Sequence, residues 1–231
     1  TASPRVSFAY KTGKSSQLSL AYGDFFQQPD SDVLKFTNEL EAQHTQHYIL
    51  NYQYSANNRI FRAEVYRKQY HNLVTYNGEF PNLNSTFQNG GDGFAQGLDL
   101  FWRDNETLKN IDYWVSYSYL DTERKYKNYP FEATPSFADL NSPGFLQKKT
   151  KGYNSLSLNW AYLISQQQIL YVSVNNVLAT KNINGYQYAN TADANGIFAR
   201  RELLPAADQF FFVGFFWPIS DDGKDNQLDN L

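Results

Sequence analysis

Apolar and polar residues alternate along stretches of about ten residues throughout this chain. In the first of these stretches Val6, Phe8 and Tyr10 occupy alternate positions, and the residues between them are small or polar. The same period returns at 16–26 and at 154–162. Because successive side chains of a strand point to opposite sides of the sheet, each stretch predicts a strand with one apolar and one polar face.

The length of these stretches separates two all-β architectures. Strands of soluble sandwiches run for about five or six residues, whereas a tilted strand that crosses a membrane needs about nine to eleven. Several stretches here reach the longer value. The chain also has 18 tyrosines, 18 phenylalanines and 4 tryptophans, 17% of its residues, and such rings suit the two interfaces of a bilayer. We therefore predict an antiparallel, up-and-down transmembrane β-barrel.

The overall composition excludes other classes. There is no run of eighteen apolar residues, so no transmembrane helix is expected, and a mean hydropathy of −0.60 is compatible with a barrel because only alternate residues meet lipid. The net charge of −3 gives no support for nucleic-acid binding. The absence of cysteine excludes disulfides and thiolate chemistry.

The expected strands number nine. They are residues 4–12, 16–26, 44–55, 58–76, 92–103, 110–122, 151–163, 167–180 and 209–219. Short connections alternate with long ones, as in bacterial outer-membrane barrels, which have short periplasmic turns and long extracellular loops. We expect residues 1–220 to form the barrel portion, and residues 221–231 to form an acidic tail.

The odd number of strands bears on closure, because an up-and-down barrel made by one bacterial chain has an even number. A tenth strand at Ile197–Leu204 that pairs back to Val6 would give a small closed barrel. Otherwise the chain is an arc. If the last strand ends in the periplasm, the first begins at the outer surface, as expected for the C-terminal portion of a larger barrel.

Several segments also resemble a known family in their order and spacing. They are Pro4–Lys11, Ala21–Pro29, His47–Tyr52, Arg62–Lys68, Asn72–Val74, Gly93–Phe101, Tyr113–Tyr119, Val174–Leu178, Gly185–Tyr186, Pro205 and Phe210–Phe216. Across essentially the whole chain, they resemble the C-terminal barrel portion of a TonB-dependent outer-membrane receptor of the type abundant in Bacteroidetes. Relatives usually carry another hairpin near Ala138–Asn141, and their barrels commonly finish on the last aromatic strand, so this chain departs from the pattern twice.

This resemblance implies an active transporter in the bacterial outer membrane, with a barrel of about 22 strands. The implied partners are outer-membrane lipid, the remaining barrel strands, an N-terminal plug domain, TonB acting through that plug, and a scarce nutrient such as an iron chelate, cobalamin or a glycan. Nothing in these residues matches the plug. The chain alone is therefore not expected to be a competent pump.

Charged residues of the expected strands form a candidate lumenal set. If apolar residues face lipid, five charged side chains point into the lumen: Arg62, Glu64, Asp99, Arg103 and Asp112. There they are expected to form ion pairs or to contact the plug or ordered water, because buried charges must be paired or hydrated. Acid–base catalysis by two carboxylates would need a close geometry that a sequence does not supply.

Aromatic residues of the long connections are the candidates for nutrient contact. The substrate-binding set is Phe80, Phe87, Tyr126, Tyr129 and Tyr186, and Phe36, Phe131 and Tyr188 are of the same kind. Rings at these places stack on sugars or line a chelate pocket. The alternative is that they belong to the interfacial girdle or anchor the packing of the loops.

Metal and cofactor sites are not expected. His44 and His47 lie three residues apart, so on a strand they face opposite sides, and His71 falls at the far end of the next strand. Asp92 and the acids of the tail lack the rhythm of a calcium loop. No nucleophile elbow, nucleotide loop or zinc-protease motif occurs, so an enzyme is not expected.

Two other readings remain open from the sequence. One is the small closed barrel, acting in the outer membrane as a structural protein or adhesin. The other is a soluble β-sandwich that binds carbohydrate, which predicts that a particular set of side chains is buried in a core: Leu20, Tyr22, Leu158 and Trp160.

Overall fold

The computed structural model describes residues 2–76, 83–124, 152–165, 168–192, 194 and 198–217. In this part of the chain the elements are β1 (Arg5–Lys11), β2 (Ser16–Gln27), α1 (Ser31–Leu34), β3 (Gln43–Ala56), β4 (Arg59–Tyr76), β5 (Phe87–Asp104), β6 (Ile111–Arg124), β7 (Tyr153–Ser165), β8 (Gln168–Asn175), β9 (Gly185–Ala192), β10 (Phe198–Leu203) and β11 (Phe210–Phe216). The protein is therefore nearly all β, as predicted. No helix in the described ranges has the length and apolar composition needed to cross a membrane.

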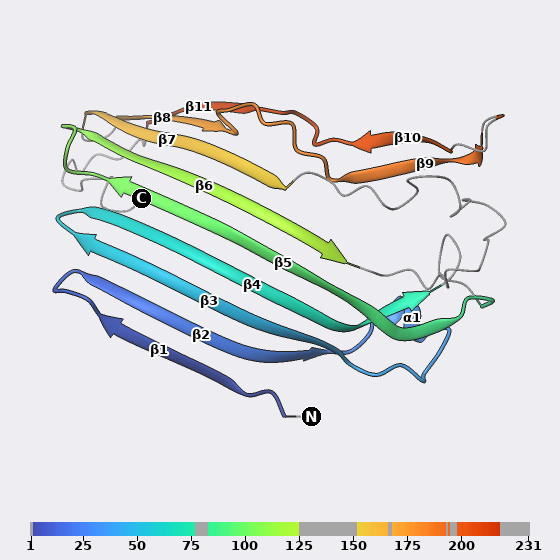
Figure 1. Ribbon diagram of the computed structural model, residues 1–231. Helices are drawn as coiled ribbons and strands as arrows, with labels where there is room; N and C mark the ends of the chain where they lie inside the picture. The colour runs from blue at the N-terminus through green and yellow to red at the C-terminus, as the bar shows by residue number, and fades with distance from the viewer. Residues whose placement is uncertain are drawn as a thin grey trace.

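Nine strands form one antiparallel sheet in the order β1-β2-β3-β4-β5-β6-β7-β8-β11 (Figure 1). Each strand lies beside the next in sequence, except that the separate hairpin β9–β10 intervenes between β8 and β11. The short connections meet at one end of the sheet, on the left of Figure 1, and the long ones at the other. This is the predicted up-and-down arrangement.

The two edges of the sheet are β1 and β11, and they do not pair with each other. The tenth strand that a small closed barrel would require exists as β10, but it pairs with β9, with Leu203 opposite Gly185, and not with β1. The alternative of a small closed barrel is therefore wrong. The sheet is an open arc of nine strands, as expected for part of a larger barrel.

The strand bounds agree with expectation to within two residues except at three places, one of which is the end of β11 at Phe216 rather than residue 219. β5 begins at Phe87 rather than residue 92, and it is paired with the end of β4 through an irregular register. β8 ends at Asn175, because Asn176 has a φ of 51° and its side chain holds the following turn by donating to the carbonyl of Thr180 at 2.8 Å. Residues 77–82 and 125–151, which include the segment Ala138–Asn141, lie outside the described residues, as does the tail.

Local chemistry explains the short turns. Asn57 and Asn58 have φ of 50° and 53°, the positive values that the two-residue turn of a right-handed twisted hairpin requires at both central positions. They connect β3 and β4 and so fix the register of that hairpin, in which Ala56 lies opposite Arg59.

The β5–β6 turn is fixed by Asp104, which is 2% exposed. Its carboxylate accepts from the amides of Glu106 at 2.8 Å and Thr107 at 2.9 Å, from the Thr107 hydroxyl at 2.6 Å, and from Arg59 Nε at 3.1 Å. Burial alone would raise the pKa of Asp104, but these hydrogen bonds outweigh it and hold the pKa well below its usual range. Asp104 thereby joins the turn to the start of β4.

One face of the sheet is apolar. The register places Leu20, Leu50, Val65 and Leu98 in a single row across β2 to β5, and we call the side that carries this row the apolar face. Leu20 is 50% exposed and Val65 is 52% exposed. The sandwich reading required Leu20 to lie in a core between two sheets, so that reading is wrong.

Candidate functional site

The opposite side of the sheet, which we call the polar face, carries all five charged residues of the candidate lumenal set. Counting through the register from Glu64, which lies opposite Asp99, puts Arg62, Arg103 and Asp112 on this same side. The structure thus brings together on one face the residues that the alternation grouped. Their assignment to a lumen stays a prediction.

The closest contact in this set is the ion pair between Arg103 and Asp112. Arg103 Nε donates to both carboxylate oxygens of Asp112 at 3.0 Å, and Nη2 donates to Oδ2 as well. Asp112 is fully buried, whereas the Arg103 side chain is 28% exposed. A carboxylate removed from water in this way needs such a partner, because an unpaired buried charge is strongly destabilising.

The other members of the set have weaker partners. Glu64 accepts a hydrogen bond from Asn51 Nδ2 at 3.2 Å, and Arg62 lies with its guanidinium carbon 6.0 Å from the centre of the Phe101 ring. Glu64 and Asp99 are cross-strand neighbours with like charge. This arrangement suits a wet or protein-lined surface.

Of the loop aromatics, Phe87 and Phe36 are the two whose side chains the structure describes. Phe87 stacks on Phe36, with ring centres 6.1 Å apart and an angle of 5°, and its centre lies 6.2 Å from that of Tyr76. Nearby, Asn89 accepts from the amide of Glu41 at 2.8 Å and donates to the Asn72 carbonyl at 3.0 Å. Phe87 therefore has a packing role where two long connections meet.

The remaining candidates for nutrient contact are less informative. Phe80, Tyr126 and Tyr129 lie outside the described residues, as does Phe131. Tyr186 belongs to β9, where it is the register partner of Glu202 in β10. Substrate contact by this set stays a prediction.

The histidines require a correction. His44 and His47 face opposite sides of β3 as expected, but His71 is not remote, since it is the direct register partner of His44, with ring centres 5.5 Å apart. In an antiparallel pair the far end of the second strand returns beside the start of the first. Among the described residues, no group of three or more His, Asp or Glu side chains is arranged to hold a metal ion.

A cluster that the sequence did not reveal surrounds Asp24 on the apolar face, near the long connections. Asp24 Oδ1 lies 2.6 Å from His44 Nε2, and Oδ2 accepts from the Tyr22 hydroxyl at 2.7 Å. That hydroxyl accepts in turn from Gln46 Nε2 at 3.2 Å. The positions alternate along β2 and β3, but only the register shows that they meet.

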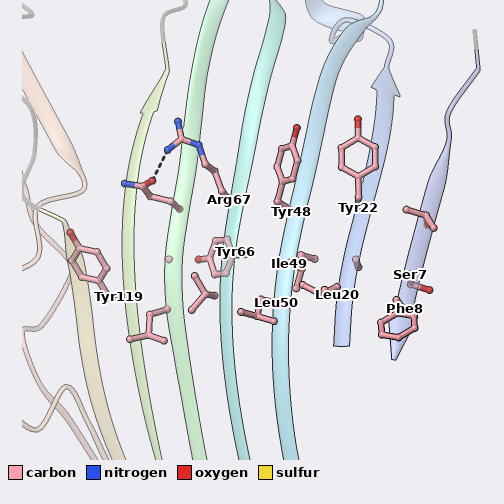
Figure 2. Close-up of a pocket in the computed structure, with 16 residues that line it drawn as sticks. Ser7, Phe8, Leu20, Tyr22, Tyr48, Ile49, Leu50, Tyr66, Arg67 and Tyr119 are labelled. Carbon is pink, nitrogen blue, oxygen red and sulfur yellow. Dashed lines mark hydrogen bonds between the residues drawn. The ribbon is translucent and has the colours of Figure 1, made fainter. Parts of the chain in front are cut away.

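Next to this cluster, on the side away from the long connections, a groove of about 740 Å³ crosses the apolar face (Figure 2). Tyr22, Tyr48 and Arg67 lie along one side, and Leu20 and Leu50 along the other. The groove separates the polar end of this face from its apolar part.

Comparison with known proteins identifies the fold. No family model and no curated protein matches the sequence. The FrpB iron transporter from Neisseria meningitidis matches in structure with a TM-score of 0.53 and 10% identity, over 93% of this chain and 39% of that one. The siderophore receptor PiuA from Acinetobacter baumannii matches with a TM-score of 0.53 and 12% identity, over 92% and 35%. This chain has the fold of one part of the β-barrel of these proteins.

A third match has the same character. The ferric citrate transporter FecA in its unliganded form gives a TM-score of 0.50 and 15% identity, over 93% of this chain and 38% of that one. The chain thus spans between a third and two fifths of the length of these proteins. The identities are low, so the likeness concerns the fold, and an open arc of nine strands is what part of such a barrel would be.

Proposed function

We propose that this chain forms the C-terminal part of the barrel wall of a TonB-dependent receptor in a bacterial outer membrane. The intact protein imports a scarce nutrient: an iron chelate, cobalamin or a glycan. The observation that carries the proposal is the single-layered, up-and-down sheet with an exposed apolar face and a charged polar face. The sequence resemblance to receptors of the Bacteroidetes type points the same way.

The free edges support a larger barrel. All residues of β1 are exposed, and β11 is exposed at every position but one. Unpaired backbone groups at a sheet edge are not tolerated in the hydrocarbon region, so a membrane-spanning sheet must close. We infer that β1 and β11 pair with further strands of the same barrel.

The two faces then have distinct partners. The apolar face meets lipid, and the polar face, with Arg62, Glu64 and Asp99, meets the plug domain or lumenal water. Energy comes from TonB through the plug, and nutrient is captured by the long connections. The function is transport and not catalysis.

Site-directed spin labelling tests the two-faced assignment. These 231 residues contain no cysteine, so a single-cysteine variant is uniquely labelled once any cysteine elsewhere in the intact protein has been replaced. Val65→Cys and Glu64→Cys are neighbours on β4 that lie on opposite faces. In the intact protein reconstituted in bilayers, the label at 65 should collide mainly with oxygen, which concentrates in lipid. The label at 64 should show low oxygen accessibility.

An alternation of period two along β4 is the expected result. Equal access of a water-soluble nickel chelate to both labels would contradict membrane insertion, and a reversed pattern would contradict the assignment of the faces. Uptake of labelled ferric chelate, cobalamin or glycan by cells that carry the intact protein, with and without TonB, tests transport and selects the nutrient.

A further inference from the structure

The groove on the apolar face follows from the register. Two rows of side chains flank it, and the row between them, which includes Ile49 and Gly97, points to the polar face. Along the groove the sheet therefore exposes backbone between two walls of side chains. Its volume lies within the range of sites that bind small molecules, about 300–1,000 Å³.

Arg67 in one wall is a cation without a carboxylate partner among the described residues. Its guanidinium donates to Gln96 Oε1 at 2.9 Å and to Gln69 Oε1 at 3.2 Å, and lies 5.2 Å from the centre of the Phe94 ring. These neutral contacts hold the side chain in place without a direct ion pair. A carboxylate joins this network only through Gln96, which donates to Asp121 Oδ2 at 3.2 Å. An arginine fixed in this way can still donate to an anionic oxygen.

Tyr48 supplies a second donor beside Arg67. The two residues are direct cross-strand partners on β3 and β4, and Tyr48 is 46% exposed. Its hydroxyl has no partner among the described residues, whereas the hydroxyl of the adjacent Tyr22 is occupied by Asp24. Figure 2 shows the Tyr48 ring and Arg67 on the same side of the groove.

The opposite wall is apolar. Leu50 and Val65 are register partners in this wall, and Leu98 continues the row. Along their strands, Leu50 is the next residue on this face after Tyr48, and Val65 is the next one before Arg67. A ligand that filled the groove would therefore meet hydrogen-bond donors at one end and aliphatic side chains at the other. This is the polarity of an amphiphile with an anionic head.

We propose that the groove binds one membrane lipid, with a headgroup phosphate between Arg67 and Tyr48 and an acyl chain over Leu50, Val65 and Leu98. The proposal rests on the proposed function, since it requires the apolar face to lie in a bilayer. On the side of the groove toward the long connections the side chains of this face are polar, Gln69 among them, and on the other side they are apolar. This change of polarity places the groove at the level where headgroups meet acyl chains. Arg67, which has no direct ion pair among the described residues, selects a negative headgroup.

Native mass spectrometry of the intact protein from mixed micelles of phosphatidic acid and phosphatidylcholine tests the site. Wild-type protein should retain phosphatidic acid in preference to phosphatidylcholine. Arg67→Gln should weaken that retention about fivefold, because it removes one positive charge near the surface. Tyr48→Phe should weaken it by a smaller factor, while keeping the ring and the fold.

Arg62→Gln is the matched control. Arg62 lies on the same strand, is also exposed and also lies over a phenylalanine ring, but it belongs to the polar face. Its removal should leave lipid retention unchanged. Soluble glycerol phosphate should not compete, because the site requires the acyl chain as well as the phosphate.

The outcomes separate the two proposals. Equal retention by wild type, Arg67→Gln and Arg62→Gln, in protein that the spin labels show to be inserted, overturns the lipid site and leaves the proposed function standing. Competition by glycerol phosphate shows a simple anion site and also overturns it. Failure of the spin labels to report lipid at position 65 overturns both.

Discussion

Arg103 on β5 and Asp112 on β6 form a forked ion pair in which the carboxylate is fully shielded from water. The two residues are diagonal neighbours on the polar face, because Arg103 lies opposite Trp114. The contact joins two strands near their short turn. Of the five candidate lumenal residues, Asp112 and Arg103 are the ones whose charges most clearly stabilise the fold itself.

We expect Asp112→Ala to destabilise the folded protein by about 2–3 kcal/mol, since it leaves the guanidinium of Arg103 without its partner. This loss is smaller than the roughly 3–5 kcal/mol typical of breaking a fully buried pair, because Arg103 is partly exposed. Urea unfolding followed by heat-modifiable mobility would measure it. Asp99→Asn, on the same face of β5 but in none of the ion pairs that the described residues form, should change stability by less than about 1 kcal/mol.

The packing around Gly97 leaves no room for a Cβ atom. A Cβ there would lie 2.5 Å from the carbonyl oxygen of Tyr119 and 2.5 Å from the Tyr66 hydroxyl, so the backbone must shift to admit it. Gly97→Ala should therefore destabilise the protein by about 1–3 kcal/mol in the same unfolding assay.

Gly90 provides the control on the same strand. A Cβ at Gly90 would meet Thr75 at 3.7 Å, an ordinary contact. Gly90→Ala should be neutral or slightly stabilising, by up to about 1 kcal/mol, because alanine loses less backbone freedom on folding. Similar losses for both variants would show that the close approach at Gly97 is absent from the folded protein.

The alternation of residues predicted the strands and the two faces because period two is a local property of each strand. It grouped Arg62, Glu64 and Asp99 correctly on one face. It did not reveal the pairs across strands, and so His71 was misplaced relative to His44, since register depends on where each turn begins. The Asp24 cluster and the groove at Arg67 depend on register in the same way.

The hairpin β9–β10 was missed for a different reason. The segment at Ile197–Leu204 has strand character, but nothing local to it tells whether its partner is the preceding segment or the distant β1. Pairing with Gly185–Ala192 closes a short loop, whereas pairing with β1 would close nearly the whole chain and cost more entropy. That comparison favours the observed hairpin.

A pH series tests the anchor at Asp104, which lies at the end of the hairpin and outside the segment that we propose spans the membrane. A carboxyl whose folded pKa is lowered stabilises the fold above its unfolded pKa, about 3.9, and that stability is lost as the pH falls through the folded pKa. Wild-type protein should therefore lose unfolding free energy below about pH 4, and Asp104→Asn should lose less over the same range.

Asn89 links the β2–β3 connection to the β4–β5 end, and its removal should loosen that junction without affecting the sheet. Its amide donates to the carbonyls of Glu41 and Asn72 and its oxygen accepts from the Glu41 amide, so Asn89→Ala removes three hydrogen bonds at once. Hydrogen exchange at the Glu41 amide should accelerate by about tenfold or more, because each bond contributes about 1 kcal/mol to local stability. Exchange in the centre of β3 should not change.

Gln88→Ala is the control, since Gln88 engages Thr75 through its backbone carbonyl and not its side chain. Equal exchange at Glu41 in the two variants would mean that the stacked Phe36 and Phe87 rings, rather than Asn89, hold the junction together.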